Sequence, residues 1–207
     1  MLVPAERKTR SPAPIGRSKL LLVEGETPAH FFEALLVHLG ISATIEVRSF
    51  GGNEQLRVFL WRLMQTAEFS LVASLAIVRD AEDDPQAARM AVDSALQSAA
   101  EAAGIIPPLK VVTFVLPDDQ RPGMIETLLV DSVRAEPAFP CVEEFFECAA
   151  QRGVVLPMGI VLAKSHAQAY LATTNAVQVP LGITASRGVW PWDNPLFEPL
   201  KQFLLGL

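Results

Sequence analysis

The chain has 207 residues, of which 50% are hydrophobic and 19% are charged, so it can form one compact domain around a sizeable apolar core. Its net charge is −6, and the first 19 residues contribute five basic side chains and one acidic one, which leaves a balance of −10 for the rest. This balance excludes a protein that coats DNA with a basic surface, so any contact with nucleic acid must come from a local patch, the basic tail, a metal ion or a partner.

The apolar segments are too short for a membrane protein. None approaches the roughly 18 residues that a bilayer-spanning helix needs, and the amino terminus lacks the apolar core of a secretory signal peptide. We therefore expect a cytoplasmic protein with no membrane partner. The low charged fraction leaves room for an apolar face that forms a homo-oligomer.

Residues 1–18 are expected to form a disordered basic tail. They contain Pro4, Pro12 and Pro14 and show no apolar period. Residues 19–207 are expected to form a single α/β domain with a carboxy-terminal extension.

The first part of this domain alternates between strand and helix patterns. Apolar runs predict strands at 19–24, 43–49, 70–78 and 109–116. Helical patterns fill the connections at 27–39, 53–66 and 85–103, with Thr27 as the expected cap of the first helix. This order predicts a parallel sheet with right-handed crossovers.

The second part is less regular and is expected to be mainly helical. Helices are predicted at 124–133, 142–151, 167–173 and 197–205, and a fifth strand at 154–163. An aromatic loop at 189–193 is expected to seal the core together with Phe197. Cys141 and Cys148, seven positions apart on one helical face, are expected to be buried, reduced thiols.

The first candidate for chemistry is Glu24, which follows the apolar run Lys19-Leu20-Leu21-Leu22-Val23 and precedes Gly25. A run without a polar break suits a parallel strand that is covered on both faces. Ligands of open α/β sheets bind at the carboxyl edge, where Glu24 would lie, and Gly25 allows a sharp turn there.

The third predicted strand also ends in acids, namely Asp80, Glu82, Asp83 and Asp84. Asp80 and Glu82, two positions apart, can both turn toward one Mg²⁺ or Mn²⁺ ion. Asp84 is better explained as a cap of the next helix, where the helix dipole favours an anion, and Asp83 is left open.

Glu126 and Lys164 complete the candidate set. Glu126 would lie in the first turn of a helix beyond the fourth strand, where a metal ligand and a favourable helix-dipole charge are equally good explanations. Lys164 follows the apolar run 159–163, so we expect it at the same sheet edge, where it could balance carboxylates and contact a phosphate. The alternative for Lys164 is an ordinary surface lysine.

Together these residues resemble the Toprim domain. The matching elements are Leu22-Val23-Glu24-Gly25 and the strand-terminal Asp80-Ala81-Glu82. The resemblance implies a Toprim-like, Rossmann-like parallel sheet of four to five strands flanked by helices. It also implies Mg²⁺-dependent phosphodiester chemistry, with Glu24 and Lys164 as catalytic residues and Glu24, Asp80, Glu82 and Glu126 as metal ligands.

Over roughly residues 19–205 the chain is most similar to small, stand-alone Toprim-related proteins of unassigned function. These are akin to the nuclease domain of overcoming-lysogenization-defect proteins. Two departures stand out: Glu82 replaces the second aspartate of the usual pair, and Pro28 stands where related proteins often carry an acid. A second metal ion would therefore lack one ligand. No phosphate loop Gly-x-x-x-x-Gly-Lys is present, so an ATPase partner would be a separate chain.

Three functions remain open from the sequence. The first is a Mg²⁺-dependent nuclease acting on nucleic acid. The second is a non-catalytic module that binds nucleic acid, a nucleotide or a partner protein. The third is a receiver-like signalling domain, which the single acid after the first strand and the surplus helices after residue 123 disfavour.

Overall fold

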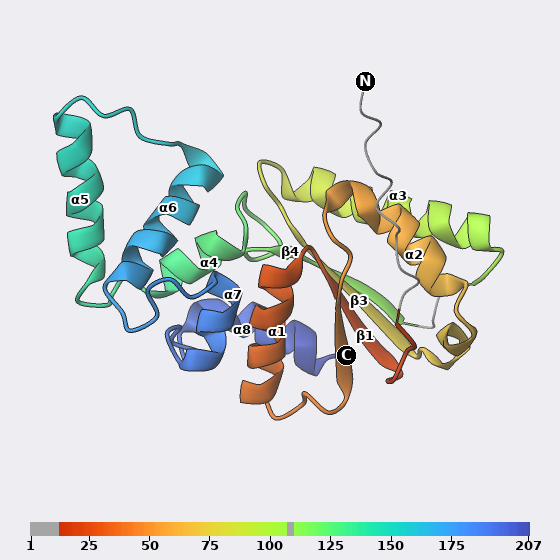
Figure 1. The fold of residues 1–207 in the computed structure, drawn as a ribbon. Coiled ribbons are helices and arrows are strands. Elements are labelled where there is room, and N and C mark those ends of the chain that lie inside the picture. The colour runs from red at the N-terminus through yellow and green to blue at the C-terminus, as the bar shows by residue number, and fades with distance from the viewer. Residues whose placement is uncertain (1–12, 107–109) are drawn as a thin grey trace, which may run out of the picture.

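The computed structural model describes residues 13–106 and 110–207, and these form an α/β fold around one four-stranded parallel sheet. The strands are β1 (Lys19–Val23), β2 (Ile45–Ser49), β3 (Ser74–Asp80) and β4 (Lys110–Leu116). Their order across the sheet is β2-β1-β3-β4, so β1 and β3 lie side by side in the middle (Figure 1). This confirms the predicted α/β class, the parallel sheet and the four strands of the first half.

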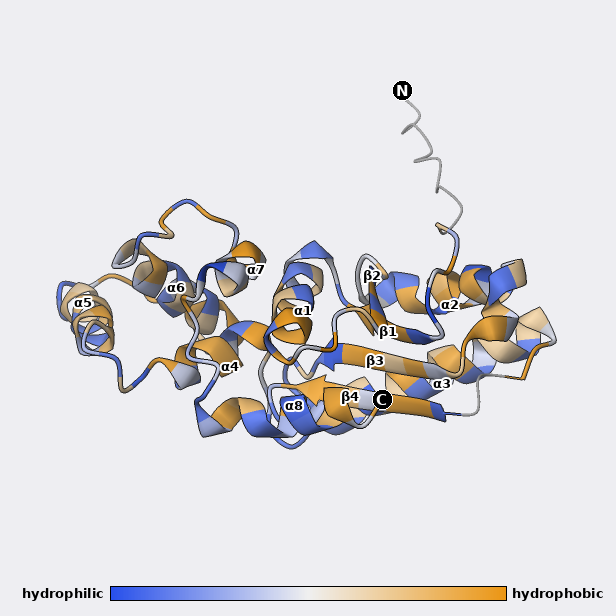
Figure 2. Cartoon of the chain, turned by 90° about the horizontal axis from the view of Figure 1, so that it is seen from below, coloured by the Kyte–Doolittle hydropathy of each residue, from blue (hydrophilic) through white to orange (hydrophobic). Residues whose placement is uncertain are grey.

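Helices cover both faces of the sheet. One face packs against α2 (Leu56–Met64) and α3 (Pro85–Ala103), and the other packs against α1 (Glu26–His38), α4 (Ile125–Ser132) and α8 (Glu198–Leu205). Side chains alternate between the two faces along each strand. The inner strands β1 and β3 are therefore apolar at most positions, as their hydropathy colouring shows in Figure 2, whereas the edge strand β2 carries Glu46, Arg48 and Ser49.

The carboxy-terminal half adds a helical extension at one end of the sheet. It contains α5 (Phe139–Gln151), α6 (Gly159–Ala172) and the short α7 (Leu181–Thr184), besides α4 and α8. In Figures 1 and 2, α5 lies farthest from the sheet, with α6 between it and α4. None of the helices within the described ranges is both long enough and apolar enough to cross a bilayer.

The predicted fifth strand at 154–163 is wrong. Residues 154–158 form an irregular connection, and α6 begins at Gly159, whose φ of 55° is in the left-handed region. The buried residues of α6 are Ala167, Tyr170 and Leu171, which is a helical spacing. The short apolar run before Lys164 is too brief to distinguish strand from helix by its period, and packing of α6 on α4 decides the outcome.

Four smaller predictions also need correction. The third strand begins at Ser74, because residues 67–71 form a 3₁₀ turn. Thr27 does not cap α1, which follows Gly25 directly. Cys141 and Cys148 are free, as expected, but both are exposed on α5 instead of buried.

The fourth correction concerns residues 13–18, the described part of the predicted disordered tail. Arg17 Nη1 donates a hydrogen bond to the carbonyl of Ser42 (2.7 Å), and Arg48 Nη1 donates one to the carbonyl of Ala13 (2.7 Å). Two arginines thus hold this segment against the β2 side of the sheet. The predicted disorder of residues 1–12 lies outside the described residues.

The aromatic segment near the carboxyl terminus seals the core, as predicted. Trp190 is buried and its Nε1 donates a hydrogen bond to Thr184 Oγ1 (2.9 Å), while Phe197 is fully buried. The ring of Trp192 lies 5.3 Å from those of both Phe31 and Phe197. These contacts fix α7 and the terminal segment against α1.

Gly182 in α7 makes the closest of these contacts. A Cβ at Gly182 would lie 2.1 Å from the carbonyl oxygen of Thr27 in the first turn of α1, and a backbone atom cannot rotate away. We expect Gly182→Ala to lower the free energy of unfolding by about 3 kcal/mol, measured by urea denaturation. Gly16→Ala is the matched control, because a Cβ there meets its nearest atom at an ordinary 3.5 Å. Equal stability of the two variants would contradict this packing.

Candidate functional site

The site lies at the carboxyl edge of the sheet. Because all four strands are parallel, their carboxyl ends share this edge, and the helices that follow them start there. β1 ends one residue before Glu24, β3 ends at Asp80, and the connection after β4 leads into α4, with Glu126 in its first turn. Three acids from separate segments therefore approach one place.

Gly25 makes the turn that Glu24 requires. Its φ is 93° and its ψ is 173°, a conformation that side chains with a Cβ rarely adopt, and α1 begins at the next residue. A Cβ there would meet no atom within 4 Å, so the glycine is required by backbone conformation and not by lack of space. The predicted strand–acid–glycine turn is confirmed.

Asp80 is the most perturbed acid of the site. Burial is the main cause that raises its pKa from 3.8 to about 7, and the carboxylates of Glu126 and Glu24 raise it further. The backbone N–H of Ile125 donates a hydrogen bond to Asp80 Oδ1 (3.0 Å), which lowers the pKa, as does the positive charge of Lys164. Asp80 therefore has two roles. It is a titratable acid at the sheet edge, and it binds the first residue of α4 by accepting the hydrogen bond from Ile125.

Glu126 and Lys164 belong to the same electrostatic group. Burial raises the pKa of Glu126, while its own backbone N–H and the charge of Lys164 act in the opposite direction. Lys164 is exposed and lies on α6, not at the end of a strand as predicted. Even so, it is close enough to act on both Asp80 and Glu126.

We call Glu24, Asp80 and Glu126 the carboxylate centre. Their positions after strands and in a first helical turn predicted that they share the carboxyl edge, and in the structure Glu24 and Glu126 are close enough to act on Asp80. The donor that sequence reasoning missed is the backbone N–H of Ile125, for which side-chain identities give no signal.

Glu82 is placed differently from the other predicted ligands. Its side chain is exposed, its φ is 53°, and its backbone N–H and carbonyl pair with the carbonyl and N–H of Gly123 (2.8 and 2.7 Å). Its charge is not among the causes of the shifts at Asp80 and Glu126. The two backbone hydrogen bonds between Glu82 and Gly123 join the loop after β3 to the segment before α4.

The remaining acids of this loop differ in role. Asp84 caps α3, since its Oδ1 accepts hydrogen bonds from the N–H groups of Gln86 and Ala87 (2.9 and 3.0 Å), as predicted. Asp83 is exposed, and the structure assigns it no contact with the carboxylate centre.

The carboxylate centre suits a hard cation in its chemistry. It offers only oxygen ligands, it is partly buried, and the positive charge of Lys164 acts on Asp80 and Glu126. As the side chains stand, however, no three His, Cys, Asp or Glu residues in the described ranges are arranged to hold an ion. Binding would require these side chains to turn from their present rotamers.

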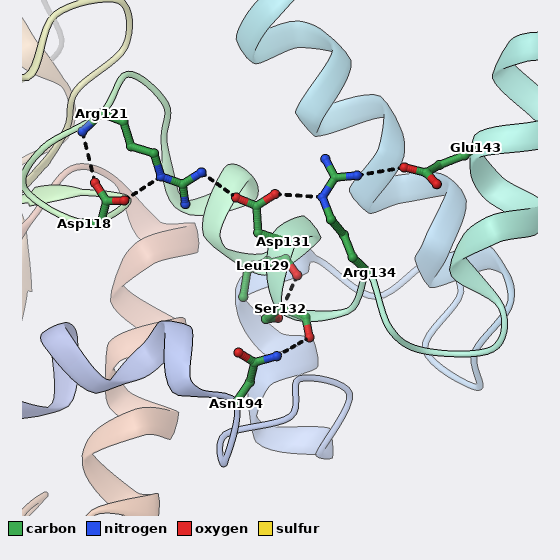
Figure 3. A network of polar contacts seen from close by, with 8 residues as sticks. All are labelled: Asp118, Arg121, Leu129, Asp131, Ser132, Arg134, Glu143 and Asn194. Atoms are coloured by element: carbon green, nitrogen blue, oxygen red, sulfur yellow. Dashed lines mark hydrogen bonds and ion pairs between the residues drawn. The ribbon is translucent and has the colours of Figure 1, made fainter.

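A chain of ion pairs holds α4 in place beside the site (Figure 3). Arg121, from the loop after β4, pairs with Asp118 and with Asp131 Oδ2 (2.9 Å), and Asp131 Oδ1 also pairs with Arg134 Nε (3.0 Å). Arg134 Nη1 reaches Glu143 Oε1 on α5 (2.7 Å). The chain thus links the loop after β4, α4 and α5.

The pKa of Asp118 shows that this series of ion pairs stabilises a charged carboxylate. Burial opposes its charged form, but hydrogen bonds from the side chain and backbone of Arg121 and from the backbone of Gln120 outweigh burial and lower its pKa.

On the far side of α4, Asn194 Nδ2 donates a hydrogen bond to the carbonyl of Ser132 (2.8 Å). The helix that carries Glu126 is therefore anchored at its carboxyl end and through the loop before it.

Residues 18–207 match the family described as "Protein of unknown function (DUF3226)", and the chain belongs to that family. No curated protein and no solved structure matches it. The match covers the sheet, the carboxylate centre and the helical extension together.

The burial of Asp80 predicts a stability that depends on pH. In the folded chain this carboxyl holds its proton up to about pH 7, whereas its ordinary pKa is 3.8. Between these values the folded state binds more protons than the unfolded state, so the contribution of Asp80 to stability falls as the pH rises and is lowest above 7.

Asp80→Asn cannot ionise and keeps an oxygen that accepts from Ile125. We expect it to be more stable than the wild type at pH 8, by at most about 4 kcal/mol, and close to the wild type at pH 4. Urea denaturation at both pH values measures this. Asp83→Asn, in the exposed part of the same loop, is the control and is expected to change stability by less than about 0.5 kcal/mol. A loss of stability in Asp80→Asn at pH 8 would contradict the burial of a charge there.

Proposed function

We propose that this protein carries out Mg²⁺-dependent phosphodiester chemistry of the Toprim type and acts as a nuclease on nucleic acid. The observation that carries the proposal is the carboxylate centre with Lys164. An acid directly after β1, one at the end of β3 and one in α4 lie within electrostatic reach of a lysine or of one another at the edge where α/β sheets bind ligands. Such grouped, perturbed acids are typical of functional sites.

The strand order supports the resemblance noted in the sequence. β1 and β3 are adjacent, with Val23 opposite Val78, so the segments carrying Glu24 and Asp80 leave the sheet side by side. The Val-Glu-Gly and Asp-x-Glu elements thus have the neighbouring placement that joint binding of one ion requires.

Each residue has a proposed role. Glu24 and Asp80 would hold the ion, Glu126 would hold a water molecule or a second ion, and Glu82 would join through rotation of its side chain. When bound, Mg²⁺ supplies positive charge that stabilises a phosphodiester as negative charge develops on it. Lys164 would contact a phosphate oxygen and offset part of the same charge.

A second candidate is a non-catalytic module that binds nucleic acid, a nucleotide or a partner protein. Two observations favour it. The described side chains form no ready-made metal group, and Pro28 is buried in the first turn of α1, where it offers no ligand for a second ion. Metal binding without turnover would support this candidate over the nuclease.

The deciding experiment is nicking of supercoiled plasmid with Mg²⁺, with Mn²⁺ or with EDTA. We expect metal-dependent nicking by the wild type and a loss of about 100-fold or more in Glu24→Gln, because an ion would lose a ligand. Glu33→Gln, an exposed acid on α1, is the matched control and is expected to retain activity. Equal metal-dependent nicking by wild type and Glu24→Gln would refute the role of Glu24.

A further inference from the structure

Arg79, the residue before Asp80 in β3, is partly buried and carries one N–H donor, at Nε, that its surroundings leave unsatisfied. Its Nε is buried and has no hydrogen-bond acceptor. Within residues 13–106 and 110–207 its guanidinium takes part in no hydrogen bond, ion pair or ring contact. No sequence pattern marked Arg79, because an arginine near a strand end has many ordinary explanations.

Arg79 as a whole is only partly buried, but a buried N–H donor without an acceptor is unfavourable, since it loses hydration and gains nothing in return. Candidate partners are near in sequence, because Glu82, Asp83 and Asp84 follow within five positions. None of them forms an ion pair with Arg79. Asp84 instead caps α3, and Glu82 is held by its backbone bridge to Gly123.

Arg79 lies on the opposite side of the sheet from the carboxylate centre. Side chains alternate along β3, so Arg79 shares the α2/α3 face with Leu75 and Ile77, whereas Asp80 shares the other face with Val78. The charge of Arg79 is not among the causes of the shifted pKa of Asp80, although the two residues are adjacent, and the more distant Lys164 is. Arg79 therefore does not serve to neutralise the carboxylates.

Part of the Arg79 side chain is accessible at the carboxyl edge, because the residue as a whole is only partly buried. Among its side-chain nitrogens, Nε is the one found to be both buried and without an acceptor.

We infer that Arg79 binds a second phosphate of the substrate, across the sheet edge from the carboxylate centre. The planar guanidinium matches two phosphate oxygens, and binding would satisfy the donor that the protein leaves without an acceptor. The substrate is then a polynucleotide strand whose neighbouring phosphates reach both places, and not a mononucleotide. This inference rests on the proposed function and adds the substrate class to it.

The test is binding of a fluorescent single-stranded DNA 20-mer, with Ca²⁺ in place of Mg²⁺, measured by anisotropy at several salt concentrations. We expect Arg79→Gln to weaken binding about tenfold at low salt. The slope of log K against log salt concentration should become shallower by about 0.7, because one phosphate contact is lost. Arg79→Lys, which keeps the charge, should retain the slope.

Two controls separate binding from folding. Arg62→Gln removes an arginine from the last turn of α2, at the opposite edge of the sheet, and should leave the slope unchanged. Urea denaturation of Arg79→Gln should show no loss of stability, because the guanidinium has no partner to lose. An unchanged slope together with lower stability would mean a structural arginine and would overturn the inference.

The outcomes also separate this inference from the proposed function. If Glu24→Gln loses nicking while Arg79→Gln keeps the wild-type slope, the inference fails and the nuclease stands. If the wild type never nicks but binds the 20-mer with an Arg79-dependent slope, the nuclease fails and the phosphate site stands. If the wild type does not bind the 20-mer, the inference is overturned.

Discussion

The parallel sheet, covered by helices on both faces, is the constraint on which the rest of this structure depends. Its inner strands β1 and β3 are buried along almost their whole length, so polar side chains can be accommodated only where the strands end. Parallel pairing then brings those ends to one edge, together with the starts of the helices that follow. The position of the carboxylate centre is a consequence of this geometry.

The helical extension completes the site from outside the sheet. α4 delivers Glu126, and α6, which packs on α4, delivers Lys164. The ion pairs from Arg121 through Asp131 to Arg134 hold α4 between the loop after β4 and α5, and the aromatic contacts of Trp190 and Trp192 hold the terminal segment. Without these elements the edge would carry two acids and no lysine.

The site is assembled at the expense of stability. Burial beside two other carboxylates penalises the charged form of Asp80, and on the other face the Nε of Arg79 is buried without an acceptor. Both are unfavourable in the chain by itself, and both are groups that a cation or a phosphate would satisfy. The two residues are adjacent in β3, and side chains alternate along a strand. The anionic and cationic groups therefore lie on opposite faces of the sheet at this edge.

The sequence by itself determined the features that depend on near neighbours. The apolar runs predicted the four strands, the period of the helices predicted α1 to α5, and Asp84 before Pro85 predicted a capped helix start. Glu24 before Gly25 predicted a turn that only glycine accommodates easily. These signals are local, because periodicity, capping and backbone conformation act over a few residues.

Tertiary structure decided the features that depend on distant contacts. The run before Lys164 has an ambiguous period, and packing on α4 makes it a helix. Residues 13–18 are held by contacts with distant residues, among them Ser42 and Arg48. The turn at Glu82 depends on Gly123, more than 40 positions away in the chain, and the shifted pKa of Asp80 depends on Glu126 and Lys164. Burial and electrostatic interaction act through space, so the linear pattern predicted a shared sheet edge for these acids without showing which of them affect the pKa of Asp80.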